Sequence, residues 1–296
     1  MRVVYVKGSP VVAALASADV ERLLAFDEKD EYVAGETRLA EGHVRLRLLI
    51  AYLGTNFHGL APQGKLRTVG DTLLDALCVV NQLLERPEFV MSGRTDAGVH
   101  AWGQVVHVDI PKPKRFDIDR VHRSLNKIVN PEIVVRSIEL APVTFDARFS
   151  ATYRHYRYTI LNRYLPDPFL TDTTWHVRSP LDIKTLQLAT DAFIGHHDFS
   201  SFCRAEKHKP DNSLVRLVTE AYWLQLPDGV LRLEIRANAF CQQMVRSIVG
   251  FLVEIGQGKR TAGDVMETLR ARDRSFAPNI APPHGLCLWE VGYRSA

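Results

Sequence analysis

The spacing of apolar residues along the chain predicts short strands and amphipathic helices in irregular alternation. Runs rich in β-branched and aromatic residues, several with every second residue apolar, predict strands. They cover residues 45–52, 105–110, 133–140, 153–161, 218–226, 230–237 and the segment ending at Tyr293. Apolar residues at three- and four-residue spacing predict helices. They cover the stretch from Thr68, a predicted N-cap, to Pro87, and residues 119–129, 181–193, 240–255 and 261–270.

Hairpins recur within this pattern, for example around Pro227-Asp-Gly229. Hairpins that alternate irregularly with helices indicate an α+β fold rather than a parallel doubly wound sheet. The 296 residues divide by content into an extension (1–43) and two stretches of similar make-up, 44–145 and 146–296. We therefore expect an extension followed by two α+β subdomains.

Charge separates the extension from the rest of the chain. The protein carries a net charge of +3, but residues 1–43 hold five Lys/Arg against eight Asp/Glu, a net charge of −3. The remainder holds 32 against 26, a net charge of +6. We expect an acidic, mobile extension ahead of a modestly basic body, and a basic body is compatible with nucleic acid.

The four cysteines, Cys78, Cys203, Cys241 and Cys287, lie in apolar or mixed runs, and none forms a C-x-x-C pair. This usage argues against a disulfide framework and a zinc site, and it fits a reducing cytoplasm. No apolar stretch reaches the roughly 18 residues that a membrane span requires. We expect a cytoplasmic protein without a membrane segment.

A glycine-framed polar loop at residues 91–104 separates two apolar runs. It places Arg94 two residues before Asp96, between Gly93 and Gly98. An arginine can keep a neighbouring carboxylate ionised, and glycines let a ligand approach the backbone closely. An ordinary hairpin turn explains the same residues equally well. The loop alone leaves both interpretations open.

Residues 148–165 combine four arginines and four tyrosines without a carboxylate. Such a composition suits a surface that follows an RNA backbone and stacks on bases, although a solvated edge strand is the alternative. Strand parity places on one face Arg154, Tyr156, Tyr158 and Ile160. A second basic stretch follows at residues 207–216. We expect Arg148, Arg154 and Lys207 to bind the substrate through its phosphates, so that binding depends on salt.

Arg246 is the only charged residue between Phe240 and Phe251 in the apolar helix predicted over residues 240–255. A guanidinium in such a helix must reach solvent or find a carboxylate.

Neither a metal nor a nucleotide cofactor is predicted. His196, His197 and Asp198 are adjacent, but neighbouring histidines in a strand or loop point apart, and no further ligand stands at a recognised spacing. The glycines at 256, 258 and 263 do not follow G-x-G-x-x-G, and the chain has no P-loop.

The motif Ser92-Gly-Arg-Thr-Asp-Ala-Gly-Val-His100 resembles the signature of the tRNA pseudouridine synthase A family. Other segments resemble that family in the same order, over residues 44–293. They are Thr68-Val69, Gly103–Val106, Phe145–Ser150, Tyr156–Tyr158, Gly195–Phe202, Ala237–Phe240, Met244–Arg246 with Val249-Gly250, and Gly285-Leu286. The resemblance covers nearly the whole chain except the extension.

The resemblance implies a role for each matched residue. Asp96 would be the catalytic aspartate, and Arg246 would pair with it and keep it charged. Tyr156 would contact the target base and serve the proton transfer at its C5 atom. Arg94 would fill the space that the target uridine leaves in the base stack.

It also implies a fold, an activity and partners. The fold would be two similar α+β subdomains around a shared, mostly antiparallel sheet, with helices on the outer face and the active-site cleft between them. The activity would be isomerisation of uridine to pseudouridine in the anticodon stem-loop, at positions 38–40 of tRNA, without a cofactor. Members of the family form homodimers that hold one tRNA across both subunits.

Four positions depart from the family's pattern. Leu53 stands where an acidic residue is usual, Leu60 where tryptophan is usual, and Gln242 and Gln243 where histidine is common. These departures spare the catalytic positions and concern the entrance loop and the fit of tRNA.

Two other functions compete with this hypothesis. One is an RNA-binding protein that keeps the scaffold but has lost catalysis. The other is a hydrolase that combines Asp96 with the histidines at 100, 107, 196 and 197, although no motif supplies its second acid or base. His100 has no assigned role beyond a structural hydrogen bond.

Overall fold

The computed structural model describes residues 39–204 and 213–294 together with two short strands near the N-terminus, β1 (Val4–Val6) and β2 (Ser9–Val11). These two strands pair antiparallel with each other. The chain divides into compact units between residues 38 and 39. Most of the predicted extension therefore lies outside the described residues, and so does Lys207.

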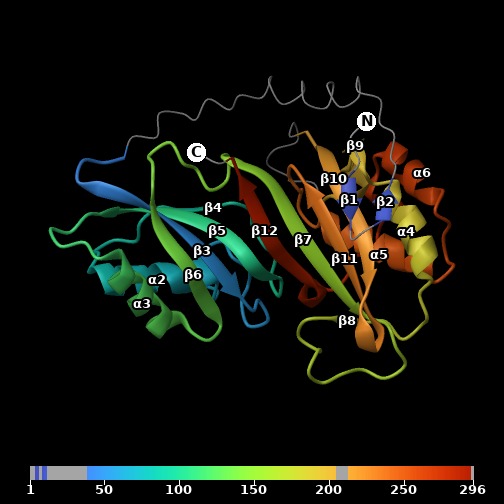
Figure 1. Cartoon of the computed structure of the whole chain (residues 1–296), viewed down its shortest axis with the longest axis horizontal. Helices are drawn as coiled ribbons and strands as arrows, with labels where there is room; N and C mark the ends of the chain where they lie inside the picture. The colour runs from blue at the N-terminus through green and yellow to red at the C-terminus, as the bar shows by residue number, and fades with distance from the viewer. Residues whose placement is uncertain (1–3, 7–8, 12–38, 205–212, 295–296) are drawn as a thin grey trace. The chain divides into compact units, whose positions relative to one another are not determined.

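Residues 39–294 are built on one large mixed sheet (Figure 1). Its strands follow the order β6 (Ile133–Ala141), β3 (His43–Tyr52), β5 (His100–Pro111), β12 (Leu286–Tyr293), β7 (Ala151–Leu161), β11 (Val230–Ala237), β10 (Val215–Gln225) and β9 (Gly195–Asp198). In addition, β4 (Phe89–Met91) pairs with β5, and β8 (Trp175–His176) pairs with β7. Among the described strands only β5–β12 and β7–β8 are parallel. The predicted α+β class is confirmed.

Two groups of helices accompany the two halves of the sheet (Figure 1). The first group is α2 (Val69–Asn81) and α3 (Ile118–Val129), which pack on each other while α3 contacts β6. The second is α4 (Ile183–Asp191), α5 (Met244–Gly256) and α6 (Asp264–Ala271), in which α4 contacts both α5 and β10. None of the described helices is long and apolar enough to cross a membrane.

One row of side chains crosses the middle of the sheet on its helix-covered face. Tyr52 pairs with Ala101, Ala101 with Leu288, and Leu288 with Tyr156. Directly paired residues point to the same side of a sheet, so these four share one face. All four are buried. The central strands β5 and β12 thus join the two halves over a continuous apolar floor.

The helix predicted from Thr68 begins as expected but ends early. Thr68 Oγ1 accepts a hydrogen bond of 3.0 Å from the backbone N–H of Asp71, which is the geometry of an N-cap. The helix stops at Asn81 because Gln82 adopts the left-handed conformation, with φ 54°. The chain therefore leaves the helix several residues before Pro87.

The helix predicted over residues 240–255 starts later, at Met244. Gln243 has a φ of 65°, which interrupts any helix that would begin earlier. The Asn238 side chain accepts hydrogen bonds from the backbone N–H groups of Leu217 and Ala239, and so ties the turn after β11 to β10. Residues 240–243 belong to this turn, although Phe240 and Cys241 continue the apolar spacing of the helix in the sequence.

The expectation that the cysteines stay unpaired is wrong for two of them. Cys203 and Cys241 form a disulfide, with Cα atoms 5.8 Å apart. The two segments are neighbours, since the backbone N–H of Arg204 donates to the carbonyl of Gln242 at 3.0 Å. Their separation of 38 residues carries no pairing signal in the sequence. Cys78 and Cys287 are free.

Candidate active site

The loop that carries Asp96 connects β4 to β5 and is anchored at its start. The backbone N–H of Ser92 donates to the carbonyl of Val105 at 2.9 Å. The Ser92 hydroxyl donates to Oε1 of Gln104 at 2.6 Å, and Nε2 of Gln104 donates to the carbonyl of Gly93 at 2.9 Å. Ser92 and Gln104 are both buried. The loop therefore leaves the sheet in a fixed direction.

A second loop, residues 54–60, supports the Asp96 loop from the side. The backbone N–H of Leu60 donates to the carbonyl of Thr95, and that of Gly98 donates to the carbonyl of Phe57, both at 3.3 Å. Gly59 has a φ of +94°, and a Cβ there would lie 2.7 Å from the Thr95 carbonyl oxygen. The close packing of the two loops requires glycine at this position.

The two glycines beside Arg94 and Asp96 have different roles. A Cβ on Gly93 would meet no atom within 4 Å, so the space beside it is open, as a close ligand approach requires. Gly98 has a φ of +78°, and its Cβ would touch Pro283 at 3.0 Å. Backbone conformation and packing, rather than ligand access, explain Gly98.

Asp96 and Arg246 meet as predicted. Nη1 of Arg246 donates to Oδ2 of Asp96 at 3.1 Å, and Nε of Arg246 donates to the carbonyl of Ala281 at 2.8 Å. The Arg246 side chain is 14% exposed and that of Asp96 is 31% exposed. Within the described part of the chain, Oδ1 of Asp96 makes no hydrogen bond. One carboxylate oxygen is thus held by the guanidinium, while the other remains available.

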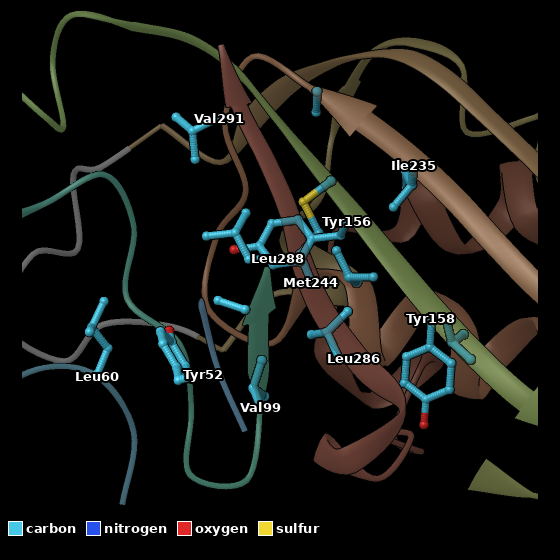
Figure 2. Packing of buried hydrophobic residues seen from close by; sticks show 14 of the residues in the cluster. Tyr52, Leu60, Val99, Tyr156, Tyr158, Ile235, Met244, Leu286, Leu288 and Val291 are labelled. Atoms are coloured by element: carbon cyan, nitrogen blue, oxygen red, sulfur yellow. The ribbon is translucent and has the colours of Figure 1, made fainter. Parts of the chain in front are cut away.

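Tyr156 forms an aromatic wall beside this pair. Figure 2 shows its ring beside Leu288 and Met244, with the hydroxyl directed away from β7. Phe240 packs edge-on against the ring, at a centroid distance of 5.0 Å. Burial is the largest cause that raises the pKa of Tyr156 to about 12, and the negative charge of Asp96 adds to it. The phenol therefore keeps its proton at neutral pH.

Tyr52 supports the loop from the floor of the site. Its hydroxyl lies 2.8 Å from Oγ1 of Thr95, the residue before Asp96, and both side chains are buried. Figure 2 shows Tyr52 beside Val99 of the same loop. Sequence reasoning assigned no role to Tyr52 or to Phe240. Only their positions next to recognised motifs could have suggested one.

His100 joins the loops of the two halves. Its Nδ1 accepts from the backbone N–H of Gly54 at 2.9 Å, which leaves Nε2 to donate to the carbonyl of His284 at 2.9 Å. Burial, the largest cause, lowers the pKa of His100, so the ring is neutral. His100 therefore makes structural hydrogen bonds, one of the two interpretations that the sequence allowed for it.

The other predicted substrate-binding residues differ in their surroundings. Arg94 and Arg148 are exposed, and the guanidinium of Arg148 lies 5.2 Å from the centre of the Phe149 ring. Arg154 is half-buried and donates to backbone carbonyls. Two of the residues that depart from the family's pattern also differ in burial. Leu60 is fully buried in the core, whereas Leu53 is 53% exposed.

Comparisons with known proteins identify the family of this chain. The family model described as tRNA pseudouridine synthase matches residues 189–294. That match, a mostly antiparallel α+β sheet and an aspartate–arginine pair between its halves define a pseudouridine synthase as the class of protein.

Relatives named tRNA pseudouridine synthase A match most of the chain. The protein from Leifsonia xyli is 40% identical over 84% of this chain and 91% of its own length. Those from Bacillus subtilis and Corynebacterium glutamicum are 39% and 41% identical, over 84% and 86% of this chain and 99% and 90% of their own lengths. The chain belongs to the tRNA pseudouridine synthase A family.

Proposed function

We propose that this protein isomerises uridine to pseudouridine in the anticodon stem-loop of tRNAs, with Asp96 as the catalytic carboxylate. The observation that carries the proposal is the Asp96–Arg246 pair, in which one carboxylate oxygen is held at 3.1 Å and the other accepts no hydrogen bond from the described residues. The names of the relatives support tRNA as the substrate.

The reaction breaks the bond from C1′ of the ribose to N1 of uracil and forms a bond from C1′ to C5. A proton leaves C5 and N1 gains one, so the step is redox-neutral. Oδ1 of Asp96 is placed to act as nucleophile or as base toward the bound nucleoside. Arg246 holds the other carboxylate oxygen, Oδ2, and so fixes the orientation of the group. Tyr156 offers a neutral phenol on the base-facing wall for the proton at C5.

The target uridine must leave its base stack to reach a partly buried carboxylate. The exposed Arg94, two residues from Asp96, is suited to occupy the vacated space. The open side of Gly93 admits the nucleotide next to the backbone. Arg148 is exposed, and it is suited to contact a phosphate of the tRNA backbone.

A homodimer is supported by the face of the sheet opposite the described helices. Trp102 and Trp289 stack there at 5.7 Å, and the guanidinium of Arg157 lies 3.4 Å from the centre of the Trp289 ring. These rings border a cavity of about 390 Å³ that Asp96 does not line. The same face of the sheet carries four exposed apolar side chains, those of Val134, Trp102, Tyr222 and Leu224. Exposed aromatic and arginine side chains are typical of protein interfaces, and a second copy is the occupant we propose.

The assay for the activity uses an unmodified tRNA transcript. We expect a mass-silent change that makes a uridine reactive toward carbodiimide, confined to the anticodon stem-loop. A transcript whose anticodon arm lacks uridine is the matched control. Tight binding without pseudouridine would indicate a catalytically silent RNA-binding protein, and strand cleavage would indicate a hydrolase. Product in another arm would contradict the assigned region.

The dimer is tested by sedimentation of the full chain. Leu224→Arg on the open sheet face should shift the protein toward monomer. Leu188→Arg, at an exposed position of α4, is the control and should leave sedimentation unchanged. A wild-type monomer at micromolar concentration would overturn the proposal.

A cytoplasmic location also follows from tRNA as the substrate, and cell fractionation tests it. Recovery of the protein in a membrane or secreted fraction would contradict this location.

A further inference from the structure

Arg154 lies on β7 at the centre of the molecule, opposite Ala237 of β11 and Val291 of β12. Its side chain points to the helix-covered face, two residues before Tyr156. The sequence predicts that this arginine binds tRNA phosphates. Its hydrogen bonds in the structure suggest a different task.

The guanidinium of Arg154 bonds four backbone carbonyls. Nη2 donates to Ser92 at 2.9 Å and to Arg148 at 2.7 Å. Nη1 donates to Asn238 at 2.9 Å and to Ala151 at 3.2 Å. One side chain thereby ties the start of the Asp96 loop to the turn before β7 and to the turn after β11.

Each of these attachments leads to a part of the active site. Ser92 is four residues before Asp96 and begins the loop that carries it. Asn238 is two residues before Phe240, whose ring packs on Tyr156. The positions of the carboxylate and of the aromatic wall therefore depend on the same guanidinium.

The surroundings of Arg154 also fit a structural cation. Within the described part of the chain, no carboxylate lies at ion-pair distance from it. Carbonyl dipoles compensate the charge, as a half-buried cation requires. Burial is the largest cause that lowers the pKa of Arg154 from its ordinary value, although an arginine remains charged.

We propose that Arg154 is a positioning residue for the reaction, which holds the Asp96 loop and the Phe240 turn in register, and that its charge does not bind tRNA phosphates. This proposal rests on the proposed function only for its kinetic readout. The planar guanidinium of arginine has donors in fixed directions and can bond four carbonyls. A lysine ammonium cannot reach three separate segments of the chain at once.

The test compares Arg154→Lys with wild type in the full chain. A misplacement of reacting groups by about 1 Å can cost on the order of 10²-fold in rate. We therefore expect kcat, and the single-turnover rate at saturating tRNA, to fall about 10²-fold. The Kd for tRNA and its dependence on salt should stay within twofold of wild type. Arg163→Lys, beyond the end of β7 and bonded to Asp167, should match wild type throughout.

Arg148→Ala provides the contrast for a phosphate contact. Removing one such contact should weaken binding and reduce the slope of log Kd against log salt by about 0.7–0.9. If Arg154→Lys or Arg154→Gln lowered the slope by that amount while kcat stayed unchanged, Arg154 would be a phosphate-binding residue and the proposal would be wrong. Wild-type kinetics in Arg154→Lys would also overturn it.

Two further measurements keep the proposal testable if a variant folds poorly or if wild type makes no pseudouridine. Gln104→Met removes the other anchor of the same loop without changing charge, and should lower kcat without altering the salt slope. Hydrogen exchange of the free protein needs no activity. In Arg154→Lys the amides of residues 92–98 and 238–240 should exchange at least tenfold faster, while those of α3 remain unchanged. Unchanged exchange at 92–98 would overturn the positioning role even if the proposed activity failed.

Discussion

Arg246 Nη1 lies 3.1 Å from Asp96 Oδ2, although 150 residues of chain separate the two. Asp96 belongs to the half of the sheet that ends at β5, and Arg246 belongs to the helix group of the other half. The ion pair therefore forms only when β5 and β12 have brought the halves together. Several expected outcomes depend on this contact.

Replacing the carboxylate should separate catalysis from binding. Asp96→Asn keeps the size of the side chain and removes its charge and basicity. We expect product formation to fall more than about 10³-fold, as for other residues that act directly on the substrate. The Kd for tRNA, measured by filter binding, should change less than about threefold. Substantial turnover by Asp96→Asn would refute the assignment of Asp96.

Removing the cation should damage both activity and stability. Arg246→Ala leaves a partly buried carboxylate and the Ala281 carbonyl without their donor. Because Asp96 is 31% exposed, we expect a loss of only about 1–3 kcal/mol in the free energy of unfolding, measured by urea titration. Arg246→Lys keeps the charge but cannot serve both acceptors, so it should recover only part of the activity. Full activity in the alanine variant would contradict the role of the pair.

Tyr156 should act in its protonated form across the working pH range. Its pKa is raised to about 12, chiefly by burial. We expect Tyr156→Phe to lower kcat by the same factor at every pH from 6 to 10. An unfolded tyrosine ionises near pH 10, before the folded one, so wild type should also lose stability relative to Tyr156→Phe between about pH 10 and 12. A rate ratio that changes with pH below 10 would rule out this interpretation.

His100 should make the protein sensitive to mild acid. Its folded-state pKa is lowered, mainly by burial, whereas the unfolded ring takes a proton near pH 6.5. The stability that His100 contributes is therefore present above that pH and is lost as the pH falls through its lowered pKa. Melting temperatures between pH 7 and 5 should fall less steeply in His100→Asn than in wild type. His58→Asn, at an exposed histidine, should follow wild type, and equal slopes in all three proteins would refute the expectation.

The disulfide should contribute to stability. A cross-link across 38 residues is expected to be worth roughly 2–4 kcal/mol. A thiol reductant should therefore lower the melting temperature of wild type, and Cys203→Ser should melt at the lower temperature with or without reductant. Cys78→Ser, at a free cysteine, serves as the control. An equal melting temperature of wild type with and without the reductant would contradict this expectation.

Local patterns in the sequence predict most elements of this fold. The cap at Thr68 and the alternation in β7 are short-range signals, and the structure confirms both. The predicted start of α5 was wrong because Phe240 and Cys241 suit a turn as well as a helix, and Gln243 adopts a left-handed conformation. The Cys203–Cys241 pair was missed because contacts across 38 residues leave no periodic trace.

The residues of the candidate site also divide into those whose roles the sequence predicted and those whose roles it did not. Asp96 and Arg246 could be named from a motif and from the cost of a charge in an apolar helix. The task of Arg154 could not, because its partners are backbone carbonyls, and every residue type carries one. An arginine that binds carbonyls and an arginine that binds phosphates look alike in sequence. Only the hydrogen bonds of the folded structure distinguish them.

The position of β12 has a consequence for synthesis. It is the last strand in chain order, yet it lies between β5 and β7 at the centre of the sheet. A nascent chain with both flanking strands already outside the ribosome still lacks the strand that joins them. Asp96 and Arg246 therefore remain apart until residues 286–293 have emerged. A nascent chain that stops before residue 286 is therefore expected to modify no RNA, however early its first half folds.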